Sequence, residues 1–134
     1  MSVEHKQTLY ERMGGADTIN RLVQSFYAKV AQDPELSPIF PNDLTLTREK
    51  QRKFLTQFFG GPPLFSQEYG HPMLRARHMR FPVTPTRAKA WLSCMQRTLT
   101  ELDIDEEVKQ EMFRRLVLTA QHMINTPDKP ETKG

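Results

Sequence analysis

The chain has very little cysteine. Cys94 is its only one, so no internal disulfide can form, and we expect the protein to work in a reducing compartment, the cytoplasm. No apolar run approaches the roughly 18 residues that a membrane-spanning helix needs, and the first residues, MSVEHK, lack the pattern of a signal peptide. The sequence therefore predicts neither a disulfide-rich secreted domain nor a membrane protein.

Dense basic stripes are also missing. The formal net charge is +3, but the longest basic cluster, formed by Arg75, Arg77 and Arg80, is interrupted by other residue types. Nucleic-acid binders show denser basic stripes with aromatic residues among them. No glycine-rich loop opens a helix after a strand, as a nucleotide site would require. We therefore expect no nucleic-acid partner and no nucleotide loop.

Apolar residues are scarce as well. They make up 37% of the 134 residues, against roughly 45–50% in ordinary globular proteins when glycine is counted. A bound apolar cofactor could supply part of the missing interior, although a thin core would give the same composition. The length indicates one domain, expected over 1–127. From Thr126 the chain is polar and contains two prolines, so we predict a disordered tail over 128–134.

Apolar residues recur at helical spacing between proline and glycine clusters, without sustained strand alternation, which predicts an all-α fold. Thr8 and Glu11 fit a capping box, and Thr84 followed by Pro85 fits an N-cap with proline at the first helical position. Either Asp103 or Asp105 would cap the last helix. The expected helices, two of them short, cover about 8–14, 17–31, 46–59, 72–79, 85–102 and 103–123.

Hydrogen-bonding side chains interrupt the apolar faces of three predicted helices. Thr47 and Gln51 lie seven and three residues before Phe54 and so share its inward face. Tyr27 and Trp91 lie on the inward faces of two other helices. A buried polar group without a partner costs about 1–3 kcal/mol. These side chains therefore satisfy one another in the core, which the residues alone favour, or they surround a polar ligand.

The four histidines show no zinc-like spacing. His5 is close to the chain end, His71 could cap a short helix, and His122 lies where a cation complements a helix dipole. His78 falls in the predicted short helix. One protein ligand holds iron well only when a macrocycle supplies the others, which is the haem arrangement. A purely structural role is the alternative for each histidine.

Several segments, in this order and at these spacings, resemble the truncated haemoglobins, specifically group II. The resemblance covers about residues 8–127, nearly the whole folded part. The segments are FY at 26–27, DP at 33–34, PIFP at 38–41, FL at 54–55, FFGGP at 58–62, GHPMLRARH at 70–78 and AWLSCM at 90–95. The resemblance implies a two-over-two helical sandwich around haem b (iron protoporphyrin IX), with the second and third helices crossing the last two.

The resemblance also implies a role for individual residues. His78 would be the proximal iron ligand. Tyr27, Gln51 and Trp91 would face the bound gas, and Thr47 stands where many globins carry a distal histidine. Lys50 and Arg77 are implied to meet the haem propionates. The residues implied to contact the haem are His78, Phe40, Lys50, Phe54, Leu55, Met73, Arg77, Trp91 and Met95.

The activity implied by this resemblance is reversible dioxygen binding for transport or storage, with NO and CO as other small ligands. Some group members carry tyrosine where this chain has Phe40, which cannot donate a hydrogen bond, so Tyr27 has one potential partner fewer. Two alternatives remain. One is a haem-dependent NO dioxygenase or peroxide-handling protein served by an external reductase, and the other is a helical interaction module without cofactor. A monomer or homodimer is expected.

Overall fold

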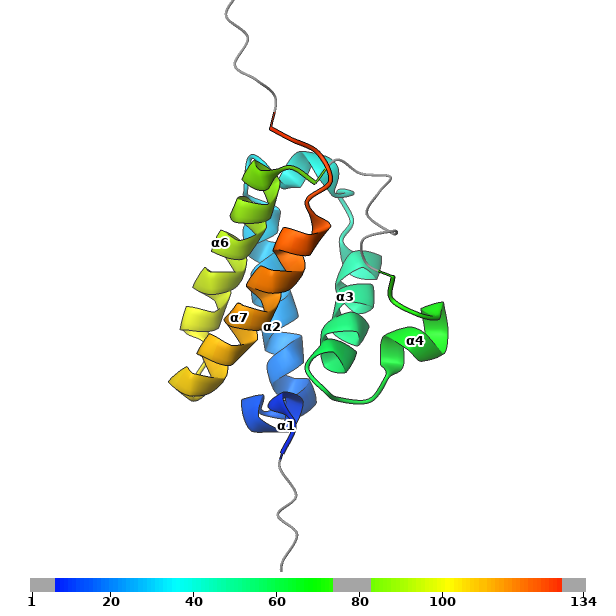
Figure 1. Cartoon of the computed structure of the whole chain (residues 1–134), viewed down its shortest axis with the longest axis vertical. Helices are drawn as coiled ribbons and strands as arrows, with labels where there is room; N and C mark the ends of the chain where they lie inside the picture. The colour runs from blue at the N-terminus through cyan, green and yellow to red at the C-terminus, as the bar shows by residue number, and fades with distance from the viewer. Residues whose placement is uncertain (1–6, 74–82, 129–134) are drawn as a thin grey trace, which may run out of the picture.

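The computed structural model describes residues 7–73 and 83–128, and every regular element within them is helical (Figure 1). The all-α prediction is thereby confirmed. None of the helices in these two ranges is long and apolar enough to cross a membrane. The elements are α1 (Leu9–Met13), α2 (Gly15–Val30), the 3-10 helix η1 (Ser37–Ile39), α3 (Thr45–Phe58), α4 (Leu64–Tyr69), α6 (Pro85–Glu101) and α7 (Glu106–Met123).

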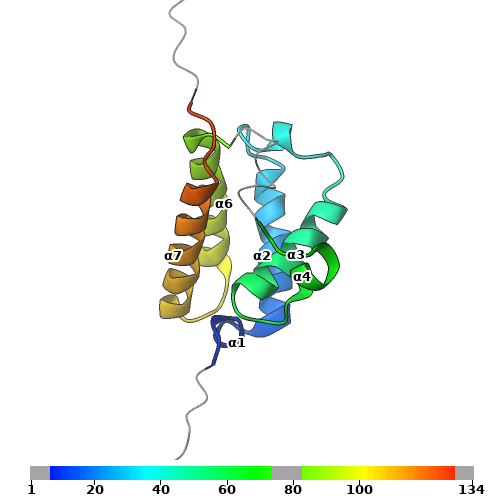
Figure 2. The ribbon, with the colours of Figure 1, turned by 45° about the vertical axis from the view of Figure 1, so that its right-hand side comes forward.

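The four long helices form two layers (Figure 2). α2 lies beside α3 in one layer and α6 lies beside α7 in the other, with α2 also packing against α6. α1 contacts α2 and α7 at one end of the molecule, and α4 lies against α3. This is the expected two-over-two arrangement.

Short-range capping sets several helix ends as predicted. The Thr8 hydroxyl accepts a hydrogen bond from the Glu11 backbone N–H at 3.2 Å, and the Glu11 carboxylate accepts one from the Thr8 N–H. Gly14 ends α1 with a φ of 113°, a left-handed conformation that suits glycine. The Thr84 hydroxyl caps α6 through the Arg87 N–H. Of the two aspartates proposed for α7, Asp105 is its cap.

The sequence did not predict α4, which directly follows the GGPP motif. Most of the short helix predicted over 72–79 lies outside the described residues, which include only Pro72 and Met73 of that span, neither of them helical. Six residues are too few to show a helical period. Tertiary contacts hold α4 instead, since the Gln57 side chain bonds both the hydroxyl and the N–H of Ser66, at 2.8 and 2.9 Å.

The core lies between the layers and includes one face of α2. Cys94 is fully buried in the same core cluster. Phe26 packs edge-on against both Tyr27 and Trp91, with ring centroids 4.9 and 5.1 Å apart. The buried residues of the α2 face are Thr18, Ile19, Leu22, Val23, Phe26, Tyr27 and Val30.

Candidate cofactor site

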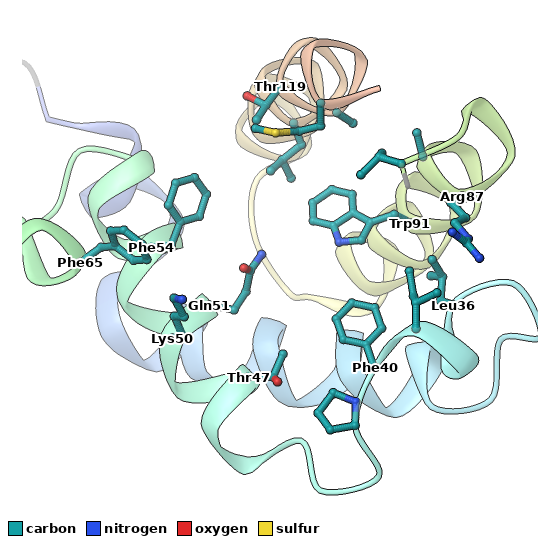
Figure 3. A pocket seen from close by; sticks show the side chains of 17 residues that line it. Leu36, Phe40, Thr47, Lys50, Gln51, Phe54, Phe65, Arg87, Trp91 and Thr119 are labelled. Atoms are coloured by element: carbon teal, nitrogen blue, oxygen red, sulfur yellow. The ribbon is translucent and has the colours of Figure 1, made fainter. Parts of the chain in front are cut away.

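A cavity of about 470 Å³ opens between α3, α6, α7 and the segment that contains η1 (Figure 3). This volume lies within the roughly 300–1,000 Å³ of small-molecule and cofactor sites. Its lining is predominantly apolar, which favours a large apolar ligand. The lining residues are Leu36, Ile39, Phe40, Pro41, Thr47, Lys50, Gln51, Phe54, Phe65, Val83, Arg87, Ala88, Trp91, Leu116, Thr119, Ala120 and Met123.

Two polar side chains point into this apolar space from opposite walls. Gln51 projects from α3 and Trp91 from α6, with the amide of one and the indole N–H side of the other turned toward the open centre (Figure 3). Thr47 lies one turn before Gln51 and lines the same wall. Neither the Gln51 side chain nor the Trp91 side chain makes a hydrogen bond within the described part of the chain. Both can therefore donate to a ligand between the walls.

Tyr27 lies beside the cavity and is 4% exposed. It contacts the lining residue Phe40 edge-on, with centroids 6.0 Å apart. Its hydroxyl has no hydrogen-bond partner among residues 7–73 and 83–128, where no completely buried side-chain oxygen or nitrogen lacks one. The hydroxyl therefore keeps contact with open space. Burial raises the pKa of Tyr27 well above its usual value, so the group stays a protonated donor.

Two cationic side chains line the cavity. Lys50 is exposed on α3, and its ammonium lies 5.0 Å from the ring centroid of Tyr69 and 6.0 Å from that of Phe65. These cation–π contacts hold Lys50 at the edge of the cavity near α4. Arg87 reaches the cavity from the first turn of α6. Such cations favour a ligand that carries carboxylates.

The structure brings only part of the predicted site together. Leu55 and Met95 are completely buried in the core and do not line the cavity. Met73 is 59% exposed, has a positive φ of 42°, and is not part of the lining either. His78 and Arg77 lie outside the described residues. The predicted residues that do line the cavity are Phe40, Thr47, Lys50, Gln51, Phe54 and Trp91.

Sequence reasoning missed much of the lining, in particular Phe65, Arg87 and the α7 wall. Leu116, Ala120 and Met123 follow one another at helical spacing on α7 and are all buried, which indicates an inward face. That pattern does not distinguish a face against protein from a face against a ligand. Phe65 gave no signal because it lies on the unpredicted helix α4.

The cavity fits a haem by its chemistry. Aromatic and aliphatic walls suit the flat, apolar ring, and Lys50 at the edge suits a propionate. The unpartnered donors of Gln51 and Trp91 suit a polar gas beside the iron. In the described part of the chain no three or more His, Cys, Asp or Glu residues gather as a metal site. A haem, whose ring supplies four nitrogens, needs no such cluster.

Comparisons with known proteins agree with this geometry. A family model described as bacterial-like globin matches residues 8–125. A group 2 truncated haemoglobin of Bacillus subtilis is 53% identical over 116 residues, which cover 87% of this chain and 87% of that protein. The crystal structure of the group II truncated haemoglobin from Bacillus anthracis has a TM-score of 0.92 at 50% identity, covering 96% of this chain and 98% of the other. A truncated oxygen-avid haemoglobin from Bacillus subtilis has a TM-score of 0.85 at 51% identity, covering 89% and 100%.

Proposed function

This chain belongs to the bacterial-like globins and, within them, to the group II truncated haemoglobins, and from that premise we propose that its cavity holds haem b and binds dioxygen reversibly. Haem would supply the ferrous iron to which the gas binds. The observation that carries the proposal is the pair Gln51 and Trp91, which face an apolar cavity from opposite walls without hydrogen-bond partners of their own. The oxygen-avid character of one relative supports the same function.

The residues outside the cavity lining that complete the proposed site are His78, Arg77 and Tyr27. The resemblance assigns His78 as the protein ligand of the iron. Arg77 and the cavity residue Lys50 would bind the two haem carboxylates, for which the exposed ammonium of Lys50 is placed at the cavity edge. Tyr27 would donate from beside Phe40.

The donors act through electrostatics. Bound dioxygen carries partial negative charge, and a hydrogen bond to a charged group in a low-dielectric pocket is stronger than one in water. The Tyr27 hydroxyl, the Gln51 amide and the Trp91 indole can each donate. Because burial keeps the pKa of Tyr27 high, this hydroxyl retains its proton at any physiological pH. The three groups should therefore slow gas release.

The single buried cysteine is compatible with work in the cytoplasm.

Absorption spectra of the purified protein test the proposal. Samples are compared in the oxidised state, in the reduced state, and in the reduced state after dioxygen is admitted and then removed. We expect three distinct haem spectra, with the reduced spectrum restored when the gas is withdrawn. A colourless protein whose apo form does not take up haemin would contradict the proposal, as would irreversible oxidation at the first contact with dioxygen.

A further inference from the structure

The chain turns back after α7 and runs across the start of α6, where residues 125–128 form what we term the C-terminal clasp (Figures 1 and 2). The Asn125 side-chain oxygen accepts a hydrogen bond from the Val83 N–H at 2.9 Å. The Val83 carbonyl accepts bonds from the N–H groups of Asn125 and Thr126, at 3.0 and 3.2 Å. Both backbone groups of Val83 are thus satisfied by the clasp.

The clasp also completes the N-terminus of α6. The Asp128 carboxylate accepts a hydrogen bond from the Thr86 N–H at 3.2 Å, while the Thr84 hydroxyl takes the Arg87 N–H. The first turn of a helix has N–H groups without helical partners, and here two are bound by side chains. Asp128, the first residue of the tail that the sequence predicts as disordered, thus contacts the first turn of α6.

These contacts join two walls of the cavity. On one side of the clasp, Val83 and Arg87 line the cavity at the start of α6. On the other side, Ala120 and Met123 line it at the end of α7. Trp91, the donor on the α6 wall, lies one turn after Arg87. The start of α6 and the end of α7 are thus joined by a pairing between residues 42 positions apart.

We propose that Asn125 is a positioning residue for the cofactor, which holds the start of α6 against the end of α7 and so keeps the cavity walls closed on the haem. This inference rests on the proposed function. Asn125 itself is not part of the cavity lining, so it would act through Val83 and the first turn of α6. Loss of its side-chain oxygen would leave the Val83 N–H unpaired and loosen this wall.

The test replaces the acceptor and measures haem retention. Asn125→Leu removes the oxygen at similar volume, whereas Asn125→Asp keeps it. Thr8→Ala is the matched control, because it also removes a side-chain acceptor from a backbone N–H, but at α1. Haem loss to an excess of a haem-free acceptor globin is timed for each holoprotein. Thermal unfolding of each apoprotein gives its stability separately.

A second readout follows the wall directly. Trp91 is the only tryptophan of the chain, so the emission of the apoprotein reports the α6 wall and its quenching reports haemin binding. We expect Asn125→Leu to release haem about tenfold faster than the unaltered chain and to shift the Trp91 emission. Asn125→Asp should have the haem loss rate and the Trp91 emission of the unaltered chain. Thr8→Ala should change neither quantity, even if its apoprotein is no more stable than that of Asn125→Leu.

The outcomes separate the two proposals. Equal haem loss and equal emission in Asn125→Leu and the unaltered chain would overturn the role of Asn125 while leaving the haem site intact. If Thr8→Ala loses haem as fast as Asn125→Leu does, the effect reflects general protein stability, and this result would also overturn the role of Asn125. If Asn125→Leu does not fold, Asp128→Ala takes its place, because it removes another bond of the clasp. Its haem loss and Trp91 emission are then compared with those of the unaltered chain and Thr8→Ala. Failure of the unaltered chain to bind haemin would overturn the proposed function and this inference together.

Discussion

The ring of Tyr27 packs edge-on against the ring of Phe40, with centroids 6.0 Å apart and planes inclined by 77°. Edge-to-face contacts of this kind fix the orientation of both rings. Phe40 has no hydroxyl, so the contact orients Tyr27 without occupying its hydroxyl. The phenylalanine at position 40 therefore leaves Tyr27 free to donate to a ligand, and this relationship underlies the first prediction.

Tyr27→Phe should accelerate dioxygen release. A hydrogen bond to a charged acceptor contributes about 1.5–3 kcal/mol, which corresponds to roughly ten- to a hundredfold in the release rate. Carbon monoxide carries less charge when bound, so its release should change much less. Stopped-flow release rates of both gases provide the measurement. Equal acceleration of both would mean that the side chain controls steric access and not hydrogen bonding.

Tyr27 should also make the folded chain sensitive to alkali. Its folded pKa lies above that of an unfolded tyrosine, near 10. Above about pH 10 the unfolded state has lost a proton that the folded state keeps, so the free energy of unfolding falls as pH rises, by up to about 1.4 kcal/mol per pH unit. Below that pH the contribution is complete. Urea unfolding of the apoprotein from pH 8 to 11 should show a shallower alkaline loss for Tyr27→Phe, since Tyr10 and Tyr69 are common to both proteins; parallel curves would refute the buried state of Tyr27.

His78→Ala should abolish stable haem binding or change the reduced spectrum, because the resemblance makes His78 the sole protein ligand of the iron. His122→Ala serves as the control, since His122 is exposed in the last turn of α7. Spectra of both variants are recorded after reconstitution with haemin. An unaltered spectrum and unaltered gas binding in His78→Ala would show that another group binds the iron.

Substitutions of Met95 and Phe54 should distinguish a residue of the core from a residue that lines the cavity. Met95 is completely buried and is not part of the cavity lining, whereas Phe54 lines the cavity. Met95→Ala should lower the free energy of unfolding of the apoprotein by about 2–5 kcal/mol and leave the haem spectrum of the folded protein unchanged. Phe54→Ala should weaken haemin binding beyond its effect on apoprotein stability. A changed haem spectrum in Met95→Ala would return Met95 to the haem contacts that the resemblance implied.

Turnover with NO should stop after one reaction per haem unless an external reductase is added. A repeated cycle needs an electron each time, and neither the sequence nor the described residues contain a strand followed by a glycine-rich dinucleotide loop. NO consumption by the pure oxygenated protein with NADH is the measurement, with an added ferredoxin-type or flavin reductase as the positive control. Consumption well beyond one equivalent without a reductase would make the chain a self-sufficient enzyme.

Short-range features were predictable because their partners lie close together in the sequence. Thr8 and Glu11, or Thr84 and Arg87, are three residues apart, so the capping bonds follow from local geometry. The inward face of α2 follows from helical spacing alone. The same spacing placed Gln51 and Trp91 on inward faces, and their side chains do point into the cavity.

Contacts between distant residues were decided only by the tertiary structure. Periodicity placed Met95 and Trp91 on the inward side of α6, but only the packing of α2 and α7 buries one in the core and turns the other to the cavity. The hydrogen bond from the Val83 N–H to the Asn125 side chain joins residues 42 positions apart, and the bonds of Gln57 to Ser66 join two different helices. The sequence by itself thus determined the long helices, several of their caps and their inward faces. The cavity required the assembled helices, because its walls come from separate segments whose distances no local pattern encodes.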